Sequence, residues 1–254
     1  MIKRELYMNR IRPFIGGELI KVMTGIRRSG KSVMLELIKE ELAEAGVAPS
    51  QMISINFEDM RYSHLQTATA LHDEIIKRAE GIEGKAYLFF DEIQEVEGWE
   101  KCVNSLRVAL DCDIYITGSN AKLLSGELAT YIGGRYVEFV IYPFSFAEFL
   151  ELYHTIAPSD SIQQCFQKYL LAGGMPYLAN LRYEEEPSRQ YLTDLFNSVQ
   201  LKDIVKRNKI RDIDLLERII AYMTANVGTV FSASSLAKFF KNEQRTVAAE
   251  TILN

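Results

Sequence analysis

The eight residues from Gly25 to Ser32 constrain the fold of this 254-residue chain more than any other feature. They read Gly-Ile-Arg-Arg-Ser-Gly-Lys-Ser and match G-x-x-x-x-G-K-[S/T], a pattern typical of a phosphate-binding loop. Apolar residues predict a strand at 19–25, and apolar residues at helical spacing predict a helix at 31–45. A strand, a glycine-bounded loop and a helix in this order predict a nucleotide-binding α/β domain.

This phosphate loop, residues 25–32, offers the groups that a triphosphate needs. Its glycines let main-chain N–H groups point at the phosphates, at the positive end of the following helix. We expect Lys31 to bridge the β- and γ-phosphates and the Ser32 hydroxyl to bind Mg²⁺. The alternative is a glycine turn followed by a chance Lys-Ser pair, which the expected strand and helix disfavour. The expected nucleotide-binding residues are Gly25, Ile26, Arg27, Arg28, Ser29, Gly30, Lys31, Ser32 and Val33.

Another apolar strand, expected at 86–90, ends in the carboxylates of Asp91 and Glu92. We expect Asp91 to take part in the Mg²⁺ shell and Glu92 to orient and deprotonate the attacking water. A solvated acidic turn is the alternative, because further glutamates follow. The phosphate loop upstream favours the catalytic interpretation.

Three further residues are candidates for contact with the γ-phosphate. Ser119 and Asn120 follow a strand expected at 113–117, where a polar residue would contact the γ-phosphate or the lytic water. Arg135 is a candidate arginine finger, acting from the same or a neighbouring subunit. A turn or cap at 119–120 and a surface role for Arg135 are the alternatives.

The order of expected elements predicts the fold class. Strands alternate with helices in the first half, which predicts a parallel sheet covered on both faces. After Pro143 the strand rhythm is lost and helices dominate. A Ser232-capped helix and a further helix from Gln244 predict a winged-helix or helix-turn-helix module. Further strands are expected at 52–57 and 136–141, and helices at 65–80, 99–110, 144–153, 162–171, 188–206 and 214–226, with a short strand at 230–231.

These elements predict three parts. Residues 1–142 would form the nucleotide-binding core with an N-terminal helix, 143–205 a helical lid or linker, and 206–254 a winged-helix-like module. The chain stops at Asn254 inside the last expected helix, so we expect the natural protein to continue.

Composition excludes several classes. A net charge of −5 argues against a general polyanion binder, because such binding needs clustered Lys and Arg. Three scattered cysteines indicate neither a disulfide framework nor a zinc site. No segment approaches the ~18 apolar residues that a membrane span needs, so a cytoplasmic location without membrane contact is expected.

The motifs together resemble the prokaryotic AAA-like, archaeal-type ATPase family, which is related to the STAND NTPases. The resemblance covers roughly residues 5–250 and depends on the order and spacing of its motifs. These are the phosphate loop, Asn56-Phe57-Glu58-Asp59, Phe90-Asp91-Glu92-Ile93-Gln94 with Trp99, Ile116-Thr117-Gly118-Ser119-Asn120, Gly134-Arg135-Tyr136-Val137-Glu138 and Tyr142-Pro143-Phe144-Ser145-Phe146.

The resemblance implies a three-layer P-loop NTPase core with a five-stranded parallel sheet of order 5-1-4-3-2, then a helical segment and a partial winged helix. It implies ATP and Mg²⁺ as ligands. Pro176 looks like the proline of an element beside the adenine that reports the nucleotide state, with a plain interhelical turn as the alternative. Glu58 and Asp59 look like an acidic pair near the metal site, although Asp59 is as plausible as a helix cap.

The expected function is a Mg²⁺-dependent ATPase acting as a switch or motor on a protein or DNA partner through the winged-helix region. A homo-oligomer is compatible with this. One alternative is a nucleotide-gated DNA-binding or scaffold module with negligible hydrolysis; another is a small-molecule kinase, which the water-activating pair at 91–92 disfavours. DNA is a candidate partner because of a late basic run, although a solvated helix face explains such a run as well. The run consists of Lys202, Lys206, Arg207, Lys209 and Arg211, with Lys238, Lys241 and Arg245 after it.

Overall fold

The computed structural model describes residues 2–118, 132–199, 205, 210, 212–230 and 232–242. The chain divides into two compact units, residues 1–193 and 194–254. The three parts expected from the sequence, with boundaries at 142/143 and 205/206, stay predictions.

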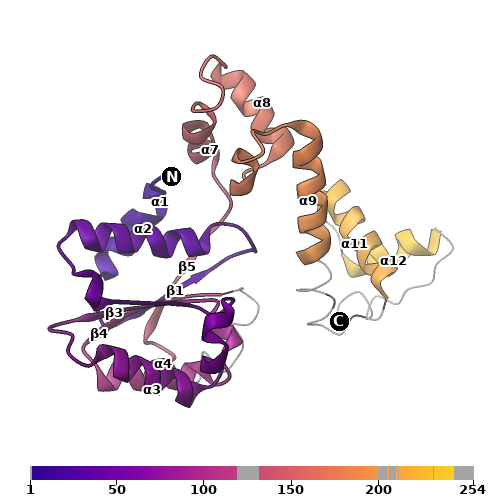
Figure 1. Ribbon diagram of the computed structural model, residues 1–254. Helices are drawn as coiled ribbons and strands as arrows, with labels where there is room; N and C mark the ends of the chain where they lie inside the picture. Colours follow the sequence, from indigo (N-terminus) through magenta and orange to yellow (C-terminus); the bar gives the residue numbers. More distant parts are fainter. Residues whose placement is uncertain are drawn as a thin grey trace. The chain divides into compact units, whose positions relative to one another are not determined.

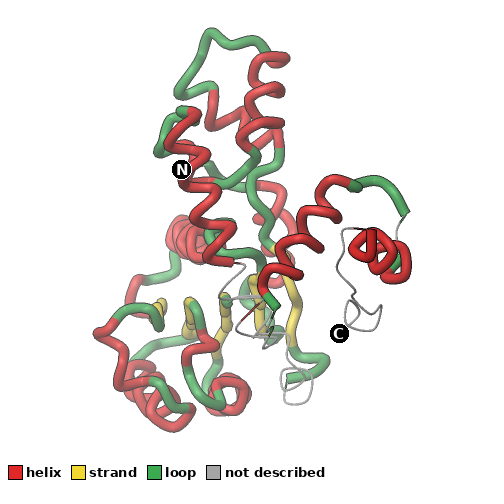
Figure 2. The backbone as a smooth tube through the Cα atoms, turned by 90° about the vertical axis from the view of Figure 1, so that its right-hand side faces the viewer, coloured by secondary structure: helices red, strands yellow, loops and turns green. Residues whose placement is uncertain are grey.

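The first unit is built around a parallel sheet of five strands in the order β2-β3-β4-β1-β5. Read from the other edge, this is the predicted order 5-1-4-3-2, which is therefore confirmed. Because all neighbours are parallel, the carboxyl ends of β1, β3 and β4 lie at one edge of the sheet, and Figure 2 shows the strands in yellow between helices. The strands are β1 Ile20–Thr24, β2 Met52–Asn56, β3 Ala86–Asp91, β4 Cys112–Thr117 and β5 Tyr136–Val140.

Helices cover both faces of this sheet, which confirms the predicted α/β class (Figure 1). Buried side chains of α1 and α2 pack on one face. Those of α3 and α4 pack on the other. The helices are α1 Glu5–Ile11, α2 Lys31–Glu44, α3 Ala68–Ala79 and α4 Trp99–Ala109, with short 3₁₀ helices η1 Arg12–Phe14, η2 Pro49–Gln51, η3 Met60–Leu65 and η4 Ile93–Glu95.

Two helices begin later in the chain than the sequence predicts, because the side chain of the residue before each helix caps its first turn. Helix α3 begins at Ala68 and not at 65, because the Thr67 hydroxyl accepts a hydrogen bond of 3.3 Å from the Ala70 N–H. The expected helix at 144–153 begins at Phe146, after Ser145. There the Ser145 hydroxyl accepts a 3.3 Å hydrogen bond from the Glu148 N–H in a capping box.

An ion pair lies in the core of the sheet. The side chains of Lys21 on β1 and Asp113 on β4 are fully buried and contact each other. A buried charge needs a partner and further hydrogen bonds. Asp113 has these, because it also accepts from the Tyr115 hydroxyl at 2.7 Å and from the Gly16 N–H at 2.6 Å. The lysine inside the first strand is therefore structural.

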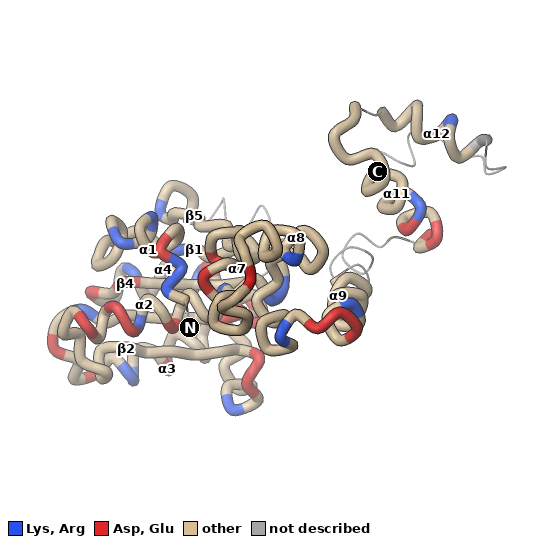
Figure 3. The backbone as a smooth tube through the Cα atoms, turned by 90° about the horizontal axis from the view of Figure 1, so that it is seen from above, with Lys and Arg blue, Asp and Glu red and all other residues tan. Residues whose placement is uncertain are grey.

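The rest of the first unit is helical, as expected after Pro143. Aromatic rings join its helices, since Phe149 lies 5.2 Å from Tyr169 and 5.0 Å from Tyr183 between ring centroids. The elements are α7 Phe146–Tyr153, α8 Ile162–Ala172, η5 Pro176–Ala179 and the beginning of α9 Glu185–Val199. Figure 3 shows Lys and Arg positions interspersed with Asp and Glu positions along the helices of the first unit.

The second unit contains α11 (Ile213–Ala225) and α12 (Ala233–Asn242). Three buried side chains form a small cluster between them, namely Leu215, Leu236 and Phe240. The predicted Ser232 start is confirmed, because the Ser232 hydroxyl accepts a 3.2 Å hydrogen bond from the Ser235 N–H.

The winged-helix prediction stays a prediction. Val230 belongs to no strand, and Phe231 and residues 243–254 lie outside the described residues. Most of the basic run also lies outside them. Among the residues that are described, the helices are all too short or too polar to cross a membrane.

Candidate nucleotide site

The phosphate loop leaves β1 at Gly25, in a conformation that only glycine adopts easily. Gly25 has φ +142°, and a Cβ atom there would lie 2.2 Å from the carbonyl oxygen of Ile141. The same segment is tied to β1, because the Ile141 N–H donates a 2.7 Å hydrogen bond to the Thr24 carbonyl. The absence of a side chain at Gly25 therefore lets the loop pack against the end of β5.

The loop ends at the N-terminus of α2. Arg28 has φ 62° and Gly30 has φ 101°, so the chain turns twice through the left-handed region before Lys31 begins the helix. Successive turns of this kind form a concavity of main-chain N–H groups. Because the first N–H groups of a helix have no partner within it, this end of α2 can receive an anion.

Lys31 and Ser29 are the buried residues of the second half of the loop. The Lys31 side chain is buried, and its ammonium donates to the carbonyls of Gly25 at 3.3 Å and Ile26 at 3.2 Å. The Ser29 hydroxyl oxygen is buried and has no hydrogen-bond partner among the residues that the structure describes. Ser32 is exposed at the first turn of α2.

Asp91 ends β3 and is held by the strands on both sides. It is 6% exposed. The hydroxyl of Thr117 on β4 donates to its Oδ1, and the amide of Asn56 on β2 donates to its Oδ2 at 3.1 Å. One carboxylate is thus fixed at the edge of the sheet where β1 opens into the phosphate loop.

Glu92 follows in a strained conformation, with φ 55°. Its N–H donates a 3.1 Å hydrogen bond to the Thr117 hydroxyl, and its carboxylate accepts one from the Gln94 amide. Burial raises the pKa of Glu92; the Gln94 hydrogen bond and the positive charge of Lys31 partly offset this rise. Glu92 directly follows β3, at the edge of the parallel sheet where β1 leads into the phosphate loop.

Sequence reasoning missed the residues that hold this carboxylate pair. Asn56 and Gln94 lie within motifs that were noticed, but no role was expected for them. Thr117 ends an expected strand and lies in the motif at 116–120, but no role was expected for it either. The available signal was position alone, since polar residues at the carboxyl ends of adjacent parallel strands lie side by side.

The remaining side chains of the loop lie around its outside. Ile26, Arg28 and Val33 are exposed and Arg27 is half-buried. Any contribution of Ile26 and Val33 to a phosphate therefore comes from the main chain, as in the expected N–H cradle.

Pro176 is connected to the phosphate loop through two tyrosines. It begins η5, and the ring of the next residue, Tyr177, lies 5.0 Å from the ring of Tyr191. The Arg28 guanidinium lies 5.5 Å from the centre of the Tyr191 ring. The expected role of Pro176 in sensing the nucleotide stays a prediction.

Arg135 is not brought to the phosphate loop of its own chain. Its carbonyl accepts a 3.0 Å hydrogen bond from the N–H of Ile20, the first residue of β1, and its guanidinium donates to Asn104 at 2.8 Å. It therefore lies at the amino edge of the parallel sheet, opposite the loop. Action from a neighbouring subunit stays a prediction.

Two other expected γ-phosphate contacts, Ser119 and Asn120, lie outside the described residues. Of the acidic pair, Asp59 caps η3 by accepting a 2.9 Å hydrogen bond from the Arg61 N–H, and also pairs with the Arg61 side chain. The negative charge of Glu58 also raises the pKa of Glu92.

The described residues fit a triphosphate with Mg²⁺. A Cβ-free position at Gly25, an unpaired buried hydroxyl at Ser29 and a buried ammonium at Lys31 meet at one loop. The oxygen donors of Asp91 and Ser32 are of the class that Mg²⁺ prefers. A carboxylate and a hydroxyl beside a loop lined by main-chain N–H groups suit a metal-bound triphosphate.

Comparison with known families gives two matches. Residues 18–150 match the family described as AAA domain, which is more than half of the chain and includes the phosphate loop, Asp91 and Glu92. Residues 163–252 match a family described as a domain of unknown function.

Among curated proteins, an uncharacterised protein of Haemophilus influenzae is 38% identical over 253 residues, which make up 99% of this chain and 62% of that protein. An uncharacterised protein of Methanocaldococcus jannaschii is 32% identical over 247 residues, 92% of this chain and 53% of that protein. The chain thus spans less than two thirds of the length of these relatives.

Among solved structures, a RuvB mutant of Thermotoga maritima aligns with a TM-score of 0.48 and 14% identity, covering 98% of this chain and 82% of RuvB. AMPPCP-bound DnaA of Aquifex aeolicus aligns with a TM-score of 0.45 and 14% identity, covering 91% of this chain and 71% of DnaA.

Proposed function

This chain belongs to the AAA domain family, and from that premise we propose that it binds ATP with Mg²⁺ at residues 25–32 and hydrolyses the ATP. The observation that carries the proposal is the placement of Asp91 and Glu92. Both are hydrogen-bonded to Thr117. They therefore lie at the carboxyl edge of the parallel sheet, where β1 leads into the phosphate loop.

Each group has a separate role in the proposed reaction. The loop N–H groups and Lys31 bind the phosphates, and Ser32 and Asp91 would hold Mg²⁺, which when bound supplies positive charge to the phosphate oxygens. Glu92 orients a water molecule and accepts its proton. The water oxygen bonds to the γ-phosphorus while the β–γ phosphoanhydride bond breaks. The electron pair of the broken bond stays on the oxygen of ADP.

We propose further that the nucleotide state changes the helical segment and so acts on a protein or DNA partner. The series of contacts from Arg28 through Tyr191 and Tyr177 to Pro176 supports this, because it links the phosphate loop to the helices that follow the sheet. A cytoplasmic location and a homo-oligomer are part of the same proposal.

The test is phosphate release by the purified chain, with and without duplex DNA. Wild type should release phosphate, and Lys31→Ala should abolish this. Lys39→Ala is the matched control, since Lys39 lies on the same helix and pairs with Glu36 on the surface. Stimulation by DNA would support a DNA partner, whereas its absence would favour a protein partner.

Glu92→Gln distinguishes hydrolysis from nucleotide-gated binding. We expect phosphate release to fall by roughly 10²- to 10⁴-fold, the usual contribution of a general base, while ATP still raises the melting temperature. Equal turnover by wild type and Glu92→Gln, with stabilisation by ATP retained, would favour the binding module.

A further inference from the structure

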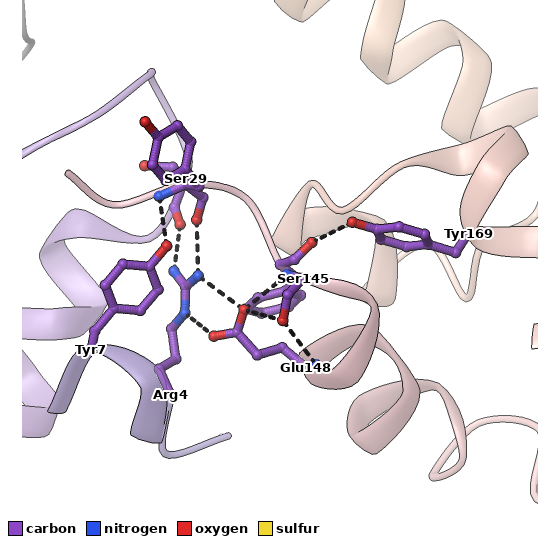
Figure 4. Close-up of polar contacts among 8 residues, drawn as sticks. Arg4, Tyr7, Ser29, Ser145, Glu148 and Tyr169 are labelled. Carbon is purple, nitrogen blue, oxygen red and sulfur yellow. Dashed lines mark hydrogen bonds and ion pairs between the residues drawn. The ribbon is translucent and has the colours of Figure 1, made fainter. Parts of the chain in front are cut away.

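Arg4 is a buried cation for which neither the sequence nor the proposed reaction provides a role. It is 3% exposed. Its guanidinium makes three short hydrogen bonds, to the Glu148 carboxylate at 2.8 Å, to the Ser29 carbonyl at 2.9 Å and to the Tyr142 carbonyl at 2.8 Å (Figure 4). One side chain therefore joins the N-terminal segment, the phosphate loop, the exit of β5 and helix α7.

The surroundings of Arg4 hold it in an unusual conformation. Its backbone is left-handed, with φ 47° and ψ 49°, which costs energy for any residue with a Cβ atom. The guanidinium lies 4.6 Å from the centre of the Tyr7 ring and 5.1 Å from that of Phe144. The Tyr7 hydroxyl accepts a 3.0 Å hydrogen bond from the Tyr142 N–H, so the same two segments are joined twice.

The bond to Ser29 fixes a peptide plane in the phosphate loop. In a trans peptide, the carbonyl of one residue and the N–H of the next point in opposite directions. With the Ser29 carbonyl held by Arg4, the Gly30 N–H points away from Arg4. A Cβ atom on Gly30 would lie 3.2 Å from the Arg4 Nη1 atom, so glycine permits this close approach.

We propose that Arg4 is a positioning residue, which orients the Ser29–Gly30 peptide so that the Gly30 N–H is aimed at a phosphate of ATP. This inference rests on the proposed ATP site. A charged donor makes a stronger hydrogen bond than a neutral one, so a single guanidinium can hold the peptide plane before the ligand arrives.

Glu148 connects Arg4 to the helical segment that follows the sheet. Its Oε2 accepts hydrogen bonds from the Ser145 N–H at 2.8 Å and hydroxyl at 3.0 Å, while its Oε1 accepts from Arg4. The preceding Phe144 donates its N–H to the Gly174 carbonyl at 2.7 Å and accepts from the Tyr169 hydroxyl at 2.9 Å. The orientation of the loop peptide is thereby coupled to the start of α7.

The first test measures Mg-ATP binding and steady-state kinetics for Arg4→Ala and Arg4→Lys. A loop amide contacts the phosphates in both the ground state and the transition state, so Arg4→Ala should raise Kd and KM by about tenfold and change kcat by less than about twofold. Arg4→Lys should fall between Arg4→Ala and wild type, because an ammonium cannot reach all three acceptors.

Arg12→Ala is the matched control. Arg12 belongs to the same N-terminal segment and pairs with Glu5 at 2.7 Å and Glu41 at 2.8 Å, away from the phosphate loop. It should lower the melting temperature without changing KM. Equal KM values for Arg4→Ala and wild type, or an equal rise in Arg12→Ala, would overturn the inference.

The second test uses hydrogen exchange of the chain without nucleotide. Arg4→Ala should speed exchange in the peptide covering residues 25–32, whereas Arg12→Ala should not. Unchanged exchange there in Arg4→Ala would overturn the positioning role even if ATP binds. Failure of wild type to bind Mg-ATP would instead contradict the proposed function, so the two failures are distinguishable.

Discussion

The Thr117 hydroxyl on β4 donates a hydrogen bond to the Asp91 carboxylate on β3. The same oxygen accepts from the Glu92 N–H at 3.1 Å, so one hydroxyl organises both members of the acidic pair. Thr117 is fully buried. The group that holds both acidic residues is therefore itself fixed in the core of the sheet.

Thr117→Val should impair hydrolysis more than ATP binding. Valine keeps the shape of the side chain but removes the hydroxyl. The Glu92 N–H then loses its hydrogen-bond acceptor, and the Asp91 carboxylate keeps only the hydrogen bond from the Asn56 amide. We expect phosphate release to fall by about 10-fold or more, and the Mg²⁺ concentration for half-maximal rate to rise. Thr117→Ser keeps the hydroxyl and should retain most activity. Wild-type rates for Thr117→Val would show that Asp91 needs no such support.

Gly25→Ala should destabilise the fold as well as the site. The added Cβ would meet the Ile141 carbonyl at 2.2 Å in a left-handed conformation, for which we expect a loss of about 2–4 kcal/mol. Gly46→Ala is the control, since Gly46 has φ +91° but nothing within 4 Å, and it should cost about 1–2 kcal/mol. Denaturant unfolding measures both, and equal losses would refute the steric argument.

The Glu148 carboxylate makes the free energy of unfolding depend on pH in the acid range. Burial would raise its pKa, but the hydrogen bonds from Arg4 and Ser145 outweigh burial, so the folded-state pKa lies below the ordinary value of 4.5. A lowered carboxyl pKa adds stability above the unfolded pKa, and that stability is lost as the pH falls through the folded pKa.

Glu148→Gln should therefore reduce the free energy of unfolding most at neutral pH. The difference from wild type should shrink as the pH falls below about 4.3, where the unfolded carboxyl becomes protonated. Urea unfolding at several pH values between neutral and acid measures this. A difference that stays constant across the range would contradict the assigned ion pair.

The buried cysteines should be unreactive in the folded chain. Burial raises the pKa of Cys102 to about 12 and that of Cys112 to about 11. Since the thiolate is the reactive form, reaction with a thiol reagent near pH 8 should be slow until denaturant is added. Fast labelling of Cys102 or Cys112 in the native protein would contradict their burial.

The local signals in the sequence were sufficient for most of the fold. The apolar run at 86–90 and the glycine-bounded loop at 25–32 depend on neighbours in the sequence, and both elements were placed correctly to within a residue or two. The sheet order came from the family resemblance and is confirmed.

The supporting contacts were not predictable, because they join residues far apart in the chain. The sequence around Lys21 does not predict Asp113 as its partner, and the sequence around Arg4 does not predict Glu148. Only the fold brings each pair together. Glu148 carried a partial signal, since Ser145-x-x-Glu148 is a capping-box pattern, but that pattern says nothing of Arg4.

Arg135 illustrates a different limit. Its motif indicated an arginine finger, but the parallel sheet places its strand start at the edge opposite the phosphate loop. Direction within the sheet, and not residue type, decides which side chains can meet a nucleotide in the same subunit.

Isothermal titration of Mg-ATP into the wild-type chain and into Lys31→Ala tests the central claim most directly. The account predicts saturable uptake of one nucleotide by wild type and none by Lys31→Ala, because the buried Lys31 ammonium and the loop N–H groups bind the phosphates together. No uptake by wild type, or equal uptake by both proteins, would contradict it.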